Sequence, residues 1–210
     1  MSLSGTQYRC LLSNVTCPAQ VVTSTATLTV RLQPTISLAA QPLTGLLPGQ
    51  QTVLTATPNP MMSTGGTSSY VWTLNGSPIT VSGNSLTVGI TQVGNYQASV
   101  RESWTGGLVC SANSSVVNIT ALVSDKLFIF PSPNDGNFQV SYYNASGTST
   151  DRRILIYDSK GSLVYDRKFA INGAYTLIPI NLERGSRGIY YVVVGSASGV
   201  KLAEGKVHVR

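Results

Sequence analysis

Charged side chains are scarce in this chain: its 210 residues include 14 Lys and Arg and 8 Asp and Glu, or 10% of the sequence. Histidine and cysteine are rarer still, with one histidine, His208, and three cysteines. These residues supply too few nucleophiles, bases and soft ligands for a catalytic triad or a zinc site. We therefore expect no enzyme, no metal and no cofactor.

Long apolar runs are also missing. No stretch approaches the roughly 18 consecutive apolar residues that cross a bilayer. The first residues have neither the basic start nor the apolar centre of a signal peptide. We predict no transmembrane segment in this chain.

Ser, Thr, Gly, Asn and Val are abundant instead, and they favour short strands joined by turns over long helices. The sequence therefore predicts an all-β chain. The net charge is +6, but the basic residues do not gather with aromatic residues on one element. A nucleic-acid groove requires such a cluster, so we expect no nucleic-acid partner.

The few charges are unevenly spread. The first 122 residues hold only Arg9, Arg31, Arg101 and Glu102, whereas the other 88 hold eighteen charged residues. A shift of this kind is typical of a boundary between two domains. We place a linker at residues 121–126.

The first part contains an internal repeat. The segment around Tyr8 is echoed around Tyr96, at an offset of 88 residues, and a Ser- and Thr-rich alternating strand follows each tyrosine. A period of about 90 residues with one tyrosine corner per copy is typical of an immunoglobulin-like sandwich. We predict a complete sandwich at residues 34–121, preceded at residues 1–33 by the last strands of a truncated one. We expect further repeats, or an enzyme, upstream of residue 1.

The strands of the complete copy follow from alternation and turn signals. They are expected at residues 35–38, 51–56, 70–74, 85–88 and 96–100. Asn75 and Gly76 favour a type I′ hairpin turn, Trp72 is the expected core tryptophan, and the Tyr96 hydroxyl is expected to bond back to its own corner. Leu54 and Ala98 stand where an antibody-type domain has its two cysteines, so packing alone must hold this core. The copy resembles the immunoglobulin-like repeats of bacterial surface proteins.

The cysteines allow two interpretations. Cys10 and Cys17 flank a short hairpin and form a local disulfide in an oxidising compartment, or Cys10 has lost a partner that lay upstream. We give the two alternatives equal weight. Cys110 has no base or basic neighbour nearby in the sequence, so we expect a small half-buried residue rather than a nucleophile.

The last 88 residues predict a second sandwich of about seven strands. These strands are expected at residues 127–130, 138–142, 153–157, 163–165, 177–180, 188–194 and 202–210. Asp158 opens a tight turn that ends at Gly161. Asp166 follows the next predicted strand, so the two aspartates are interpreted as turn residues rather than as a catalytic carboxylate pair.

Three short motifs occur in order within this predicted sandwich. They are Pro131, Pro133, Gly136 and Phe138; then Asp158 and Gly161; then Leu182, Gly188 and Tyr190. With these motifs, residues 125–210 resemble the type A C-terminal sorting domain of the type IX secretion system of Bacteroidetes. One departure is the additional Gly185, Ser186 and Arg187, which lengthens the loop before Gly188.

The resemblance implies targeting rather than catalysis. Cargo of this family folds in the periplasm and leaves through an outer-membrane translocon that recognises the folded domain, and a shuttle barrel then collects it. In many members a sortase cuts before the domain and joins the cargo to anionic lipopolysaccharide. By position, that cut falls in the linker residues Ala121, Leu122, Val123 and Ser124. The implied localisation is the cell surface or the medium.

The terminal strand offers a surface that does not depend on the cargo. Alternation places Val207 and Val209 toward the core and Lys206, His208 and Arg210 toward solvent. These three residues form a basic edge suited to acidic partner loops or to strand addition. An equally weighted alternative is that the charges only protect an edge strand from aggregation.

Residues 34–121 support a second function. Trp104 lies in a Gly-bounded loop, where it forms either a platform for a sugar ring or part of the packing at the end of the sandwich. In the first case the chain is an adhesin or carbohydrate-binding module that the sorting domain delivers. In the second case the repeat is a spacer, and its surface carries no exposed aromatic or polar patch.

Overall fold

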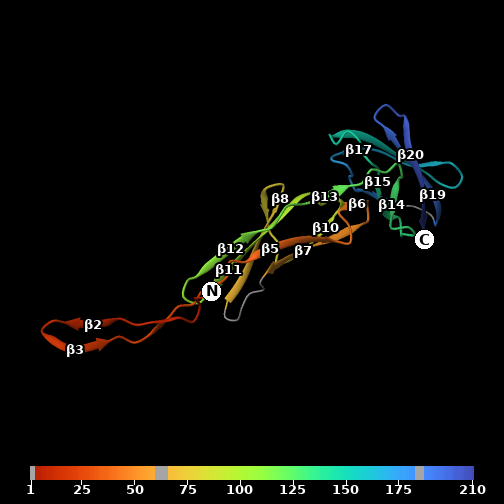
Figure 1. Cartoon of the computed structure of the whole chain (residues 1–210). Helices are drawn as coiled ribbons and strands as arrows, with labels where there is room; N and C mark the ends of the chain where they lie inside the picture. The colour runs from red at the N-terminus through yellow and green to blue at the C-terminus, as the bar shows by residue number, and fades with distance from the viewer. Residues whose placement is uncertain (1–2, 60–65, 183–186) are drawn as a thin grey trace.

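A computed structural model describes residues 3–59, 66–182 and 187–210 of the chain. Within these ranges every regular element is a β-strand except the short 3₁₀ turn η1 (Ile90–Gln92). The strands pair in three groups along the sequence: an N-terminal ribbon, a central sandwich and a C-terminal sandwich (Figure 1). The predicted all-β fold class is confirmed.

The N-terminal ribbon extends away from the sandwiches (Figure 1). It consists of β1 (Gln7–Tyr8) paired with β4 (Ala26–Thr27) and of β2 (Leu11–Asn14) paired with β3 (Cys17–Val22). Leu11 and Leu12 are 53% and 57% exposed, because no second sheet covers the ribbon in this structure. The apolar side chains of the ribbon therefore lie at the surface in this structure.

The ribbon does not support the local disulfide. Cys10 has a free thiol and lies opposite Thr23, which accepts a hydrogen bond from its amide at 2.9 Å. Cys17 lies opposite Asn14 near the hairpin tip. Six residues of strand separate Thr23 from Cys17, a rise of roughly 20 Å, whereas a disulfide needs Cα atoms within about 7 Å. In this structure the backbone therefore places the two residues too far apart for the local disulfide.

The central sandwich occupies residues 35–121. One sheet has the order β10 (Ser85–Gly89), β7 (Gln51–Asn59), β5 (Thr35–Gln41). The other has the order β6 (Gly45–Leu46), β13 (Val117–Ala121), β11 (Gly94–Trp104), β8 (Gly66–Leu74), β9 (Ser77–Ile79), and β12 (Val109–Asn113) also pairs with β11. Alternate residues of β7 and β11 are buried, which is the period that a half-buried strand requires.

Several predictions for this core are confirmed. Trp72, Leu54 and Ala98 are completely buried, and the Trp72 indole N–H donates to the carbonyl of Gly83 at 3.1 Å. The Tyr96 hydroxyl donates to the carbonyl of Gln92, four residues upstream. Because Leu54 and Ala98 fill the positions of the usual cysteines, close packing replaces the disulfide.

Two further local predictions also agree with the structure. Asn75 and Gly76 both have positive φ, 51° and 81°, as a type I′ turn requires. Cys110 is free and half-buried.

The C-terminal sandwich contains the seven predicted strands. One sheet has the order β14 (Phe128–Phe130), β15 (Asn137–Ser141), β18 (Ile178–Asn181). The other has the order β17 (Leu163–Ile171), β16 (Thr150–Tyr157), β19 (Gly188–Ser196), β20 (Lys201–Val209). Strand β17 runs six residues beyond its predicted end, so Asp166 lies within the strand and not after it.

The two sandwiches are packed together at residues 121–122. The Leu122 amide donates to the carbonyl of Leu46 at 2.9 Å, and the Leu122 side chain lies so close to Gly45 that a Cβ there would approach it to 2.7 Å. Tyr175 of the C-terminal sandwich is 4% exposed, and its hydroxyl donates to the carbonyl of Leu122 at 2.8 Å. The Tyr175 ring packs edge-on against Phe128, with centroids 5.9 Å apart. The predicted linker is therefore structured up to Leu122.

Candidate functional site

The segment that begins at Pro131 runs beside the C-terminal strand. The Asn134 amide donates to the carbonyl of His208 at 2.9 Å, and the Arg210 amide donates to the carbonyl of Asn134 at 2.8 Å. Asn134 and Val209 thus form a parallel bridge, and the His208 amide also donates to the Ser132 hydroxyl at 3.3 Å. Residues 132–134 therefore cover the last residues of β20.

This finding corrects one sequence prediction and confirms another. Val207 and Val209 are 1% and 2% exposed, while Lys206, His208 and Arg210 face solvent, as alternation predicts. The edge beside His208 and Arg210, however, is already occupied by residues 132–134, so it is not free to accept another strand. Strand addition at this end of β20 is excluded in this structure.

Gly136 joins two motif marks that lie far apart in the sequence. Its amide donates to the Asn134 side-chain carbonyl at 2.8 Å, and the Asn134 amide group donates back to the carbonyl of Pro131 at 2.9 Å. Gly136 has φ of 99°, and a Cβ there would lie 3.2 Å from the carbonyl oxygen of Leu182. The Leu182 amide in turn donates to the carbonyl of Gly136 at 3.0 Å. Glycine is required here by both its conformation and this close approach.

Asp158 and Gly161 form the tight turn that the sequence predicts. The Asp158 carboxylate accepts hydrogen bonds from the amides of Lys160 at 2.8 Å and Ser162 at 2.9 Å, and Gly161 has φ of 82°. Asp166 pairs instead with Arg153, whose Nε lies 2.8 Å from Oδ1. Hydrogen bonds from the Arg153 guanidinium lower the pKa of Asp166 below its ordinary value. The two aspartates have separate structural partners and do not form a catalytic pair.

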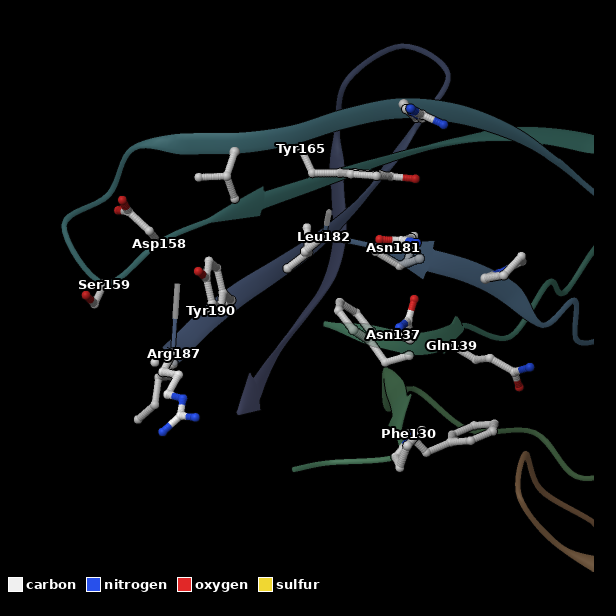
Figure 2. A pocket seen from close by; sticks show the side chains of 18 of the residues that line it. Phe130, Asn137, Gln139, Asp158, Ser159, Tyr165, Asn181, Leu182, Arg187 and Tyr190 are labelled. Atoms are coloured by element: carbon white, nitrogen blue, oxygen red, sulfur yellow. The ribbon is translucent and has the colours of Figure 1, made fainter. Parts of the chain in front are cut away.

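Six of the nine motif residues line one groove of about 1540 Å³ in the C-terminal sandwich. They are Pro131, Phe138, Asp158, Leu182, Gly188 and Tyr190. Figure 2 labels three of them, Asp158, Leu182 and Tyr190, among the other residues of the groove. Tyr165 of β17 lies on one wall, Asn181 and Leu182 lie at the end of β18, and Asp158 and Arg187 lie toward one end. Marks that are spread over 60 residues of sequence thus share one surface.

The groove has a basic lining. Among the described residues, Lys160, Arg167 and Arg187 line it together with one carboxylate, Asp158, which accepts two backbone hydrogen bonds. Arg167 lies over the ring of Tyr165, with the guanidinium carbon 5.4 Å from the centroid. Burial raises the pKa of Tyr165, and the neighbouring charge of Arg167 opposes that rise. The described cations of the lining are suited to bind an anionic group.

Sequence reasoning missed Tyr165 and Arg167 as groove residues, although a signal was present. Their spacing of two residues, continued at Phe169, places all three on one side of a strand that pairs with Ile154 and Ile156. Both isoleucines are completely buried, so this side of β17 faces the interior of the sandwich. The predicted strand ended at Tyr165, and the pattern was therefore not recognised.

The remaining candidate residues lie elsewhere. Within the linker, Leu122 and Val123 are 46% and 75% exposed, while Ala121 and Ser124 are half-buried. Trp104 is half-buried and the guanidinium of Arg31 lies 5.5 Å from its ring centroid, so one ring face is covered. Gly185 and Ser186 of the lengthened loop lie outside the described residues.

The described residues contain neither a metal-ligand cluster nor a membrane-spanning helix. Within residues 3–59, 66–182 and 187–210, His, Cys, Asp and Glu side chains do not gather in groups of three that would hold a metal ion. The same part of the chain contains no helix long and apolar enough to cross a membrane.

Comparison with known proteins gives one family. Residues 128–207 match the family described as the secretion system C-terminal sorting domain. This range begins with β14 and ends within β20, so the match covers nearly the whole C-terminal sandwich. No curated protein sequence matches the chain.

Solved structures show weaker likeness. Three N-terminal domains of the highly immunogenic outer capsid protein of bacteriophage RB49 are 17% identical, with 84% of this chain and 58% of that chain covered and a TM-score of 0.35. The FN1–FN3 domains of chicken CNTN1 are 10% identical over 99% and 78% of the chains, with a TM-score of 0.30. Dimeric latent PorU from Porphyromonas gingivalis is 15% identical over 97% of this chain and 24% of that chain, with a TM-score of 0.34.

Proposed function

We propose, from the premise that residues 128–207 form a secretion-system C-terminal sorting domain, that this chain directs a secreted cargo through the type IX system to the outer-membrane surface. The sorting-domain family is non-catalytic, and we extend this to the whole chain. The central sandwich then serves as a spacer between the cargo and the signal. The partners in this proposal are the outer-membrane translocon, the shuttle barrel and the sortase.

The observation that carries the proposal is the family match over a folded sandwich. The motif residues of this sandwich serve two purposes in the structure. Gly136 and Leu182 hold two distant segments together, and Leu182 also lines the groove with Phe138, Gly188 and Tyr190. We propose that the groove is the face by which the folded domain is recognised. A partner can recognise a folded signal of this kind whatever cargo precedes it.

We also propose that sortase cleavage occurs after Leu122. The bonds on either side of Ala121 lie in a strand that pairs with Leu46, and the Leu122 carbonyl is held by Tyr175. Val123 is 75% exposed, and it is the most accessible residue of the candidate linker. A protease must bind its substrate in an extended and accessible form, which favours the peptide bonds around Val123 and Ser124.

The experiment uses residues 1–210 whole, because Tyr175 packs against the central sandwich. A signal peptide and a fluorescent reporter that folds in the periplasm precede the chain, and the host is a bacterium with a working type IX system. We expect reporter on the surface or in the medium, and periplasmic retention in a translocon mutant. The control chain ends at residue 127 and therefore lacks only the C-terminal sandwich, which contains the family match. Equal delivery of the control would contradict the proposal.

A further inference from the structure

The two sheets of the C-terminal sandwich are closed along one side. Strands β14 and β20 meet there, and a Cβ on Gly205 would approach the Ile129 side chain to 2.7 Å. Residues 132–134 add a further length of backbone beside the end of β20. Backbone hydrogen-bonding groups on this side are therefore partly covered.

The opposite side is open. Strand β17 is the last strand of one sheet and β18 is the last strand of the other, and each has a single strand partner among the described residues. Both strands line the groove, β17 through Val164, Tyr165, Arg167 and Phe169. The groove thus lies between two strand edges whose outer N–H and C=O groups are available for pairing.

The open side also carries an exposed cation on the groove side of β17. Arg167 lies on the same side of the strand as Tyr165 and Phe169, opposite the completely buried Ile154. It takes part in neither of the two ion pairs found among the described residues, and its guanidinium lies over the ring of Tyr165. A guanidinium over an aromatic ring keeps its N–H donors free for a carboxylate.

The charges around the groove select the occupant. Among the described residues, the groove is lined by the cations Lys160, Arg167 and Arg187 and by one carboxylate, Asp158, so these residues give it an excess of positive charge. A partner that pairs with the open strand edges must have an extended backbone, and a partner that binds the cations must carry acidic side chains. Because β17 has nine residues, a partner segment of nine residues would pair with its whole length.

We infer that the groove binds an extended acidic segment of a partner protein, which adds as a strand along the free edge of β17 and places a carboxylate against Arg167. This inference rests on the proposed function, because it names the kind of partner that reads the sorting domain. Alternate side chains of the added strand point into the groove toward Tyr165 and Phe169, and the others point to solvent.

The first test uses a defined peptide and the whole ¹⁵N-labelled chain. The probe is the acetylated and amidated peptide Ser-Thr-Val-Thr-Glu-Thr-Val-Thr-Ser, whose central Glu and two Val share one face. Two further peptides carry Gln or Lys at the centre. We expect saturable chemical-shift changes in the amides of residues 163–171 with the Glu peptide, and affinity weaker by roughly tenfold or more with the Gln and Lys peptides.

Two variants of the chain locate the carboxylate contact. Arg167→Gln should remove the preference for Glu over Gln, whereas Lys168→Gln should retain it. Lys168 is the matched control because it precedes Phe169 on the same strand, carries the same charge and lies on the opposite, solvent-facing side. Thermal unfolding of both variants checks that each is folded.

Three results overturn the inference. They are equal binding of the Glu and Gln peptides, shift changes that lie outside β17 and β18, and no saturable change at millimolar peptide. If Arg167→Gln instead self-associates with no change in peptide preference, Arg167 protects the edge from aggregation and does not bind a partner.

A cellular arm separates this inference from the proposed function. The reporter fusion carries Arg167→Glu or the control Lys168→Glu. If the unchanged fusion is not exported, the proposed function fails. If the unchanged fusion and both variants are exported equally, only the acidic-strand inference fails. Selective loss with Arg167→Glu, together with the peptide preference, supports both.

Discussion

The two sandwiches share a two-sheet architecture but differ along one side of the interior. Both bury aromatic residues between the sheets: Trp72 and Tyr96 in the central sandwich are 0% and 1% exposed, and Phe138 and Tyr190 in the C-terminal sandwich are 3% and 5% exposed. The C-terminal sandwich also has Tyr165 and Phe169, which are only half-buried along the groove. The C-terminal domain therefore leaves one side of its interior open beside a groove.

The charges follow the same division. Residues 1–122 hold four charged side chains and the last 88 hold eighteen, three of them cations that line the groove. A surface with few charges is suited to a spacer, and a basic groove is suited to recognition. Two domains of the same fold can therefore serve different functions through the surfaces in which they differ.

The largest expected effect comes from breaking the closed core. Trp72→Ala should lower the free energy of unfolding of the central sandwich by about 3–5 kcal/mol, because it removes a fully buried side chain and leaves a cavity. Urea unfolding followed by circular dichroism measures this change. Val71→Ala is the control, since Val71 is the preceding residue of β8 and is 55% exposed. Similar losses in both variants would contradict the assignment of the core.

A smaller loss of stability is expected when the hydrogen bonds of Asn134, beside the end of β20, are removed. Asn134→Ala removes the hydrogen bonds to Gly136 and Pro131 and should cost about 1–3 kcal/mol, because a buried amide and carbonyl lose their partners. Hydrogen exchange at the Arg210 amide should become faster. Asn137→Ala, at an exposed surface position, serves as the control and should leave exchange at Arg210 unchanged.

The contact between the sandwiches should respond to a single hydroxyl. Tyr175→Phe removes the hydrogen bond to the Leu122 carbonyl, at a cost of about 1 kcal/mol, while it keeps the ring contact with Phe128. Limited proteolysis of the whole chain should then cut faster around residues 122–125. Tyr143→Phe is the control, because its ring also contacts Tyr175. Equal rates in the two variants would show that the hydroxyl does not protect the junction.

The smallest expected effect is the loss of the stability contributed by the Arg153–Asp166 pair at low pH. Arg153 lowers the pKa of Asp166 in the folded state, so this pair stabilises the fold above the unfolded carboxyl pKa of about 3.9. The contribution is lost as the pH falls through the lower folded value. The difference in urea midpoint between the unchanged chain and Asp166→Asn should therefore be present at neutral pH and disappear in strong acid. It should stay small and decrease with salt, since both side chains are partly exposed.

The sequence allowed much of the local structure to be predicted. Alternating apolar residues located the strands, Asn75 and Gly76 identified a turn, and Tyr96 identified its corner. Each of these features depends on residues close together in the chain. The groove was not predicted, because Tyr165, Asn181 and Gly188 come from three strands whose neighbours are set by sheet order. The parallel bridge between Asn134 and Val209 was missed for the same reason.

Local sequence patterns are enough to predict the all-β class, the uneven division of charge, the side chains that alternate into each core and the turns that require glycine. Their physical causes are local: the period of two in a strand and the steric freedom of a residue without a Cβ. Only the tertiary structure decided which strand edges are covered and which remain open. Edge pairing depends on contacts between segments far apart in the chain, as when residues 132–134 cover β20 while β17 and β18 leave a basic groove between them.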